Sequence, residues 1–138
     1  MKIKIIGCIA LALIVLVISC QNDSQVEFNR YYAGGSQIYQ SHCQNCHGAK
    51  GEGLKALIPP LTDSIYLNSN KTALACYIKN GLKGKITVHN KTFDEEMPAS
   101  DLSPIEIAKV LTYVTNSFGN KTGTINLEQV TADLGKCK

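Results

Sequence analysis

The chain has 138 residues, with 14 basic and 11 acidic side chains, six cysteines and no tryptophan. This length fits one domain. Without Lys2 and Lys4, which lie in a distinct N-terminal segment, 12 basic side chains remain against the 11 acidic ones. This nearly neutral balance excludes the basic footprint of a nucleic-acid-binding protein.

A basic start followed by an apolar run at the N-terminus is typical of a signal peptide. Lys2 and Lys4 come first, and residues 5–18 carry no charge. A helix that spans a bilayer needs roughly 20 apolar residues. The shorter run here therefore fits the core of a signal peptide better than a membrane span.

The end of that run resembles the lipobox of bacterial lipoproteins. Residues 16–20 read L-V-I-S-C, an aliphatic and small-residue approach to a cysteine, whereas Cys8 lies too early to mark a cleavage point. We expect residues 1–19 to be a cleaved lipoprotein signal peptide and Cys20 to anchor the protein by lipid to a membrane of the bacterial cell envelope, facing the periplasm or the exterior. An ordinary signal peptide and an uncleaved anchor are the alternatives. The polar, non-periodic residues 20–31 should form a flexible tether.

Helices with long, glycine-rich connections are predicted for the rest of the chain. Ile38, Tyr39 and Cys43 share one face of a helix over residues 32–44. The further expected elements are, in order, a short helical turn capped by Thr62 or Asp63 and running through Leu67, a helix over residues 71–80 between Asn70 and Gly81, a hairpin of strands 86–88 and 92–93, a helix beginning at Ser103-Pro104-Ile105-Glu106 and ending before Gly119, and a weaker helix over residues 127–134. The Ser103 helix is the clearest, because it joins an N-cap, an N1 proline and a capping-box glutamate.

The motif C-x-x-C-H, formed by Cys43, Cys46 and His47, is compatible with zinc, a redox dithiol or haem. Zinc usually needs a second ligand pair, and Cys76 and Cys137 each stand alone in the sequence. A thioredoxin-like dithiol needs a strand before the motif, where a helix is predicted. Two thioether bonds to a haem require sulfurs one helical turn apart, and a histidine directly after them can point at the iron from the same face. We therefore expect covalent attachment of one haem.

Two side chains are candidates for the axial positions of the iron. His47 would bind through Nε2 while its Nδ1–H donates to the backbone carbonyl of Pro59 or Pro60. Met97 lies in the irregular stretch E-M-P-A, where a thioether would hold the iron low-spin and raise its reduction potential. A core-filling role for Met97 and ligation by His89 are the alternatives.

From Tyr32 to Asn120 the chain resembles the class I cytochromes c. The C-x-x-C-H-G motif, the methionine–proline pair before the closing helix, and Gly35, Tyr39 and Val110 with Tyr113 carry the resemblance. In that family the first helix crosses the last through a small and an aromatic residue, which would explain a glycine that is costly in a helix. The resemblance implies an all-α fold of three to five helices around a covalent haem, with a small β-hairpin.

The domain over residues 32–138 also departs from that family's pattern. Cys76 and Cys137 are an even pair in an oxidising compartment, so we expect a disulfide that pins a C-terminal extension; two unpaired thiols are the alternative. The family's tryptophan at a haem propionate is missing. Tyr66 or Tyr77 would take that role.

The resemblance implies an electron carrier rather than an enzyme. His47 and Met97 would leave the iron no open position, so it would alternate between Fe(III) and Fe(II) without binding a substrate. Pro60, Leu82 and Phe93 are the expected apolar contacts of the haem. A haem subunit fixed in a larger oxidoreductase, and a haem enzyme or sensor with a labile methionine, are the alternatives.

A group of lysines surrounds the predicted hairpin, namely Lys79, Lys83, Lys85 and Lys91. They would steer an acidic redox partner, such as a membrane oxidase, reductase or dehydrogenase, and association would weaken with salt. The alternative is a merely solvated stretch. Lipid at Cys20 would confine the carrier to a layer above the membrane, and about ten flexible residues give a reach of roughly 15–20 Å.

Overall fold

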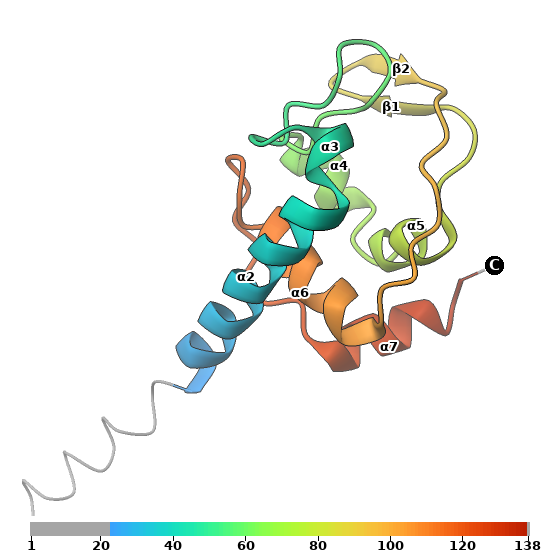
Figure 1. Cartoon of the computed structure of the whole chain (residues 1–138). Coiled ribbons are helices and arrows are strands. Elements are labelled where there is room, and N and C mark those ends of the chain that lie inside the picture. The colour runs from blue at the N-terminus through green and yellow to red at the C-terminus, as the bar shows by residue number, and fades with distance from the viewer. Residues whose placement is uncertain (1–22, 138) are drawn as a thin grey trace, which may run out of the picture.

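The computed structural model describes residues 23–137, which form six helices and one two-stranded antiparallel sheet (Figure 1). In chain order the elements are α2 (Asp23–His42), α3 (Gln44–His47), α4 (Ser64–Ser69), α5 (Leu74–Asn80), β1 (Ile86–Val88), β2 (Lys91–Phe93), α6 (Pro104–Val114) and α7 (Leu127–Leu134). The predicted all-α class with a small hairpin is confirmed. The predicted signal peptide and Cys20 lie outside the described residues, and no helix within those residues is long and apolar enough to cross a membrane.

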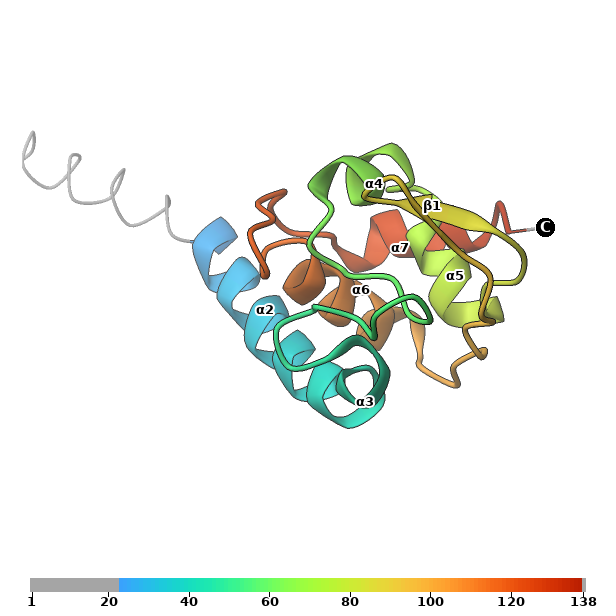
Figure 2. The same ribbon diagram turned by 90° about the horizontal axis from the view of Figure 1, so that it is seen from above.

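The core forms where α2 crosses α6 (Figures 1 and 2). Gly35 lies at the contact, where an added Cβ would overlap the carbonyl oxygen of Lys109 and lie 2.8 Å from Cβ of Tyr113. Only a residue without a side chain lets the two backbones approach this closely. The predicted role of Gly35 at the crossing of the first helix with the closing helix of the family pattern, α6, is therefore confirmed.

Aromatic side chains also pack together where α2 crosses α6. The ring of Tyr39 lies 5.4 Å from that of Tyr113 and 5.3 Å from that of Phe118, measured between centroids. The Tyr39 hydroxyl donates to the carbonyl oxygen of Gly48 at 2.7 Å, and burial raises the pKa of this hydroxyl, so it stays a donor. Because Gly48 directly follows α3, the crossing also fixes the end of the short helix that carries the cysteine motif.

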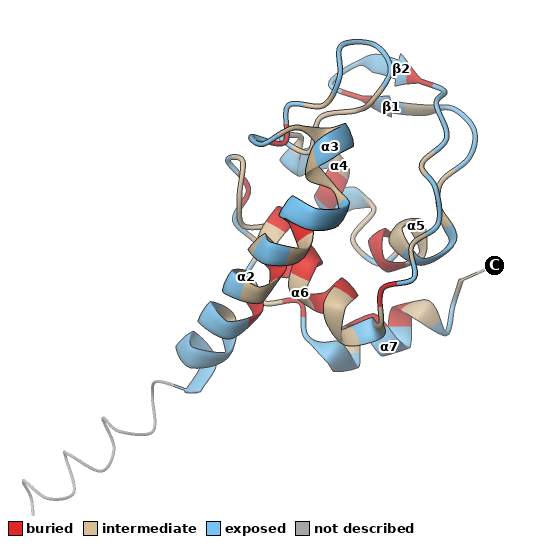
Figure 3. Ribbon diagram, in the orientation of Figure 1, coloured by how far each residue is buried: buried red, intermediate tan, exposed pale blue. Residues whose placement is uncertain are grey.

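The prediction of a flexible tether over residues 20–31 is wrong from Asp23 onward, because α2 begins there; the first three residues of that range lie outside the described part. Phe28 stacks on Tyr32 one helical turn later, with ring centroids 5.6 Å apart, and Tyr31 is buried. Figure 3 shows this end of α2 mostly exposed, with burial increasing toward α6. In residues 23–31 polar side chains outnumber the apolar ones, so the sequence shows no clear helical periodicity there.

The start of α5 also differs from the prediction. The helix begins at Leu74 rather than residue 71, because Asn70 ends α4 instead of opening α5. Its side-chain Nδ2 donates to the carbonyl oxygen of Tyr66 at 2.9 Å. Asp63 caps the N-terminus of α4, accepting from two backbone N–H groups.

The hairpin and the last two helices follow their local signals. His89 and Asn90 both have positive φ, at 49° and 59°, which is the two-residue turn that suits a tight hairpin. The backbone N–H of Ser103 donates to the Glu106 carboxylate at 2.9 Å as part of the capping box of α6. Asn126 caps α7 by accepting from a backbone N–H. These elements begin and end within a residue or two of the prediction, except that α6 ends at Val114, well before Gly119.

The C-terminal extension packs α7 against both α5 and α6. Cys76 of α5 and Cys137, beyond the end of α7, lie within disulfide distance, with sulfurs 2.06 Å apart and Cα atoms 5.6 Å apart. The predicted pairing of these two cysteines is thus present in the structure, and it closes the extension over the outer side of α5.

Candidate functional site

The cysteine motif forms one turn of helix at the end of α2. Cys43 is the N-cap of α3, and its carbonyl oxygen accepts from the N–H groups of Cys46 and His47 at 3.1 and 2.9 Å. Cys43 is half-buried and Cys46 is exposed, and these are the two cysteines of the described residues that form no disulfide. Burial, and secondarily the neighbouring Cys46 thiol, raises the pKa of Cys43 to about 11.

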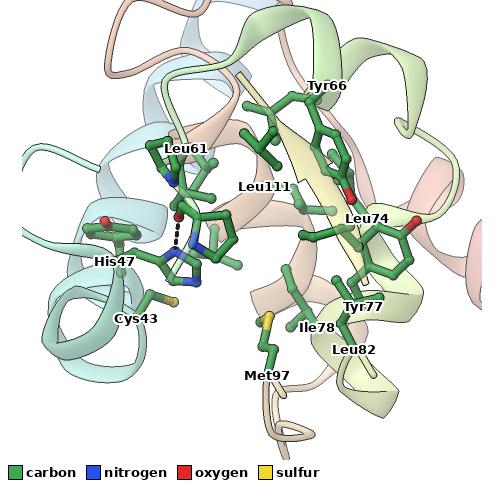
Figure 4. A pocket seen from close by; sticks show the side chains of 18 residues that line it. Cys43, His47, Leu61, Tyr66, Leu74, Tyr77, Ile78, Leu82, Met97 and Leu111 are labelled. Carbon is green, nitrogen blue, oxygen red and sulfur yellow. Dashed lines mark hydrogen bonds between the residues drawn. The ribbon is translucent and has the colours of Figure 1, made fainter. Parts of the chain in front are cut away.

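A cavity of about 730 Å³, counted with its open mouth, lies in front of this motif (Figure 4). Its lining is apolar apart from a few polar tips, and consists of Tyr39, Cys43, His47, Pro59, Pro60, Leu61, Tyr66, Leu67, Leu74, Tyr77, Ile78, Leu82, Ile86, Val88, Met97, Val110, Leu111 and Val114. The lining comes from α2 to α6, β1 and the connections between them, so every element except β2 and α7 contributes to it.

His47 projects into this cavity from the side of α3. Its Nδ1 lies 3.2 Å from the carbonyl oxygen of Pro59, and since a carbonyl only accepts, Nδ1 carries the proton. Burial lowers the pKa of the imidazole, with the hydrogen bond to Pro59 opposing the shift. The ring is therefore neutral near pH 7, with Nε2 available to bind a metal ion. Of the two carbonyls predicted, Pro59 and not Pro60 is the acceptor.

The loop between α3 and α4 holds this carbonyl in place. Gly53 donates its N–H to the carbonyl oxygen of His47, and Leu61 donates to Gly51, both at 2.8 Å. Asn120 completes the arrangement by donating Nδ2 to the carbonyl oxygen of Leu61 at 2.8 Å. Asn120 is buried, and its Oδ1 has no hydrogen-bond partner among the described residues. Sequence reasoning missed this residue, because nothing near it indicates a partner 59 residues away.

Met97 reaches the cavity from the opposite wall (Figure 4). Its backbone pairs with Leu82, each N–H donating to the other's carbonyl oxygen at 2.9 Å. Leu82, which is a predicted contact of the haem, also lines the cavity. His89, the rival ligand, lies outside the lining in the hairpin turn, where its Nε2 is 3.3 Å from Oγ1 of Thr62 and its backbone N–H donates to Asp63. The structure thus brings His47 together with Met97 and not with His89.

The other predicted contacts are only partly in the lining. Pro60 lines the cavity, but Phe93 does not, although it is buried. Its cross-strand partner Ile86 and the nearby Val88 supply the apolar surface instead. The hairpin thus contributes residues of β1, and none of β2, to the lining of the cavity.

Both tyrosines that were candidates for a polar role line the far wall. The Tyr77 hydroxyl donates to Oδ1 of Asn70 at 3.3 Å. Burial, followed by the proximity of Tyr77, raises the pKa of Tyr66. The Tyr66 hydroxyl therefore stays protonated near neutral pH and can donate to an acidic group in the cavity.

A second, more polar hollow opens beside the first. It is lined by His42, Cys43, Cys46, His47, Ile78, Met97, Pro98, Ala99, Ser100, Asp101, Leu102 and Glu106. Four of these residues, Cys43, His47, Ile78 and Met97, also line the apolar cavity. The two hollows are therefore parts of one crevice, which is apolar inside and reaches the surface beside the exposed Cys46.

The lysines around the hairpin do not form an unopposed basic patch. Lys83 lies 3.4 Å from the carboxylate of Glu96, and Lys85 lies 4.0 Å from that of Asp94. Lys79 donates to the carbonyl oxygen of Leu102 at 3.3 Å. Exposed pairs of this kind contribute little stability, but they offset local charge. Two of the four predicted lysines thus lie beside a carboxylate, which reduces the basic charge around the hairpin.

The residues of the crevice fit a covalently attached haem. Two thiols stand one helical turn apart at its edge, and an imidazole and a thioether face its interior from opposite walls. One nitrogen and one soft sulfur donor are a ligand set of haem iron in electron-transfer proteins, and the apolar lining suits a flat aromatic macrocycle. Such a group would lie against α6 at Val110 and Leu111.

Comparison with protein families agrees with this geometry. The family model described as Cytochrome c matches residues 32–117, which cover α3 to α6 and most of α2. A comparison with curated proteins found no match. The match ends before the segment that contains α7.

Proposed function

The chain belongs to the cytochrome c family, and from this premise we propose that it carries single electrons between redox partner proteins at a membrane surface outside the cytoplasm. Haem-based electron transfer through one covalent haem c is the activity of the family. When bound, that haem supplies an iron that alternates between Fe(III) and Fe(II). In the proposal, Cys43 and Cys46 hold the haem covalently, and His47 and Met97 are its axial ligands.

The observation that carries the proposal is the placement of His47 and Met97 on opposite walls of one apolar cavity. The carbonyl of Pro59 holds the imidazole in the tautomer that leaves Nε2 unprotonated. On the other wall, pairing with Leu82 holds the backbone of Met97. With both walls supplying a ligand, no position is left for a substrate, so the residues favour an electron carrier over an enzyme.

The surrounding side chains have two further roles. Apolar residues such as Leu74, Ile78 and Leu111 exclude water from the interior, which favours the less charged, reduced state and raises the potential. The hydroxyl of Tyr66 is the donor available on the far wall, because that of Tyr77 already donates to Asn70, and we assign to it a hydrogen bond to a propionate group.

The location at a membrane is proposed from the signal-peptide pattern and the lipobox cysteine. Cys20 precedes the start of α2 at Asp23 by three positions. α2 has 20 residues, which gives a helix of about 30 Å that ends at the cysteine motif. The N-terminal part of α2 would thus connect the haem domain to the lipid anchor, with only a few residues between Cys20 and the helix. The carrier would exchange electrons with membrane oxidases, reductases or dehydrogenases.

The near-infrared absorption of the oxidised protein tests the ligand assignment. A sulfur-to-iron charge-transfer band should be present in the native chain, absent in Met97→Ala and retained in His89→Ala, which serves as the matched control. A native protein without the band, or a Met97→Ala variant that keeps it, would overturn the assignment. Rapid carbon monoxide binding by the native ferrous protein would instead support a haem enzyme or sensor.

A further inference from the structure

The segment that carries Met97 is attached to the C-terminal end of α5. Met97 and Leu82 exchange two backbone hydrogen bonds of 2.9 Å, and the N–H of Ser100 donates to the carbonyl oxygen of Ile78 at 3.0 Å. These hydrogen bonds join the segment of Met97 to Ile78, near the end of α5, and to Leu82, just after it. A shift of α5 would therefore move the backbone of Met97 with it.

Gly81 allows the turn after α5 to approach the backbone of the Met97 segment closely. It has φ of +78°, and an added Cβ would lie 2.5 Å from the carbonyl oxygen of Met97 and 2.9 Å from the N–H nitrogen of Ala99. The two chain segments thus touch backbone to backbone, with no side chain between them to absorb a displacement. The position of α5 sets the position of the Met97 segment.

Opposite sides of α5 face the cavity and α7. Leu74, Tyr77 and Ile78 line the cavity, whereas Cys76 is joined to Cys137 beyond the end of α7. α5 packs against α7, and Figures 1 and 2 show these two helices side by side. On its outer side, α5 is therefore held by α7 and by this disulfide.

The extension that contains α7 is itself fixed to α6. The side chain of Thr112, which is fully buried, donates to the carbonyl oxygen of Ile125 at 3.1 Å and accepts from its N–H at 3.0 Å. Val130 of α7 is also fully buried. Asn116 adds hydrogen bonds to the backbone of Gly123 in both directions, each of 2.8 Å. The outer support of α5 is thus anchored in the packed core.

We propose that the Cys76–Cys137 disulfide, acting through α7, is a positioning device for Met97. It fixes α5 from outside, and α5 in turn holds the Met97 backbone at the distance that lets the thioether reach the iron. The inference rests on the proposed function, in which Met97 is the axial ligand. Cys137 and α7 lie beyond the region that matches the family model, which ends at residue 117, whereas Cys76 and α5 lie within it.

Opening the disulfide in the assembled holoprotein tests this role. The oxidised protein is treated with a phosphine reductant, alkylated with iodoacetamide and desalted; the control sample receives iodoacetamide alone. After opening, we expect the near-infrared band of the oxidised form to weaken. We also expect the ferrous form, prepared with ascorbate, to bind carbon monoxide about tenfold faster or more, because binding requires local release of Met97.

A readout that does not depend on the haem ligand comes from hydrogen exchange. The amides of Leu82 and Met97 should exchange about tenfold faster or more once the disulfide is open, since their mutual hydrogen bonds depend on the position of α5. The double variant Cys76→Ser/Cys137→Ser should behave like the opened protein. Tyr32→Phe, which removes a hydroxyl contact with Ser117 at the α2–α6 crossing, should change none of these readouts.

The outcomes separate the inference from the proposed function. A native protein that lacks the near-infrared band would show that Met97 is not the ligand, and the proposed function would fail. If the native protein has the band and the opened protein keeps it, with unchanged carbon monoxide binding and amide exchange, the disulfide does not position Met97. If the double variant does not fold, the reduced and alkylated holoprotein decides.

Discussion

Replacing Gly35 with alanine should destabilise the protein, although alanine is the better helix former. In an exposed helix interior this change stabilises by about 1 kcal/mol. At Gly35 the new Cβ would overlap the carbonyl oxygen of Lys109, lie 2.6 Å from its carbonyl carbon and lie 2.8 Å from Cβ of Tyr113. Real Cβ atoms essentially never show contacts below 3.0 Å, so α2 and α6 would have to move apart.

The expected loss is set by these two opposing effects. Overpacking a core costs about 1–3 kcal/mol where side chains can adapt. The main obstacle at Gly35 is the Lys109 backbone, which cannot rotate away, so we take the upper end, about 3 kcal/mol. Subtracting the propensity gain of about 1 kcal/mol leaves a net loss of about 2 kcal/mol. For a domain of this size, that loss lowers the melting temperature by about 8 °C.

Gly34 provides the matched control in the same helix. A Cβ there would meet only the Lys109 side chain, whose nearest atom is Cδ at 3.1 Å, and this flexible chain can shift. Gly34→Ala should therefore leave stability unchanged or raise it by up to about 1 kcal/mol. Urea unfolding of both holoproteins, followed by far-ultraviolet circular dichroism, measures the difference. Equal effects of the two substitutions, or a Gly35→Ala variant as stable as the native chain, would refute the reasoning.

Two further predictions concern the loop beside His47 and the membrane anchor. Asn120→Ala should cost about 1–3 kcal/mol, because it removes a buried donor from the carbonyl oxygens of Leu61 and Val114. It should also speed amide exchange in residues 48–61, and unchanged exchange there would show that Asn120 does not hold the loop. Cys20→Ser should move the protein from the membrane pellet to the soluble fraction after lysis; retention in the pellet would argue against lipidation at Cys20.

Features encoded in short stretches could be predicted closely. The capping box at Ser103 and the N-cap at Asn126 each act within one helical turn, so the residues that decide the helix start lie together in the sequence. The spacing of Cys43, Cys46 and His47 likewise describes one turn of α3. In each case local hydrogen bonds determine where the helix begins, and the tertiary contacts are consistent with that local structure.

Features that depend on distant partners were missed or misjudged. The lysines near the hairpin looked basic in sequence, but Lys83 and Lys85 pair with Glu96 and Asp94 across it. The polar start of α2 looked like a tether because its helical stability comes from a few aromatic and buried contacts. The hydrogen bond from Asn120 to the loop before α4 has no local signal at all.

The disulfide of the C-terminal extension could be predicted from the sequence, but the helix that it holds in place could not. The pairing of Cys76 with Cys137 could be expected from counting cysteines, but a count does not say which element is held. The structure shows that Cys76 lies on the outer side of α5, whose other end is bonded to the Met97 segment. On its inner side α5 packs against α6 and lines the cavity. The disulfide and α7 hold its outer side, so this added support acts on the helix to which the Met97 segment is bonded.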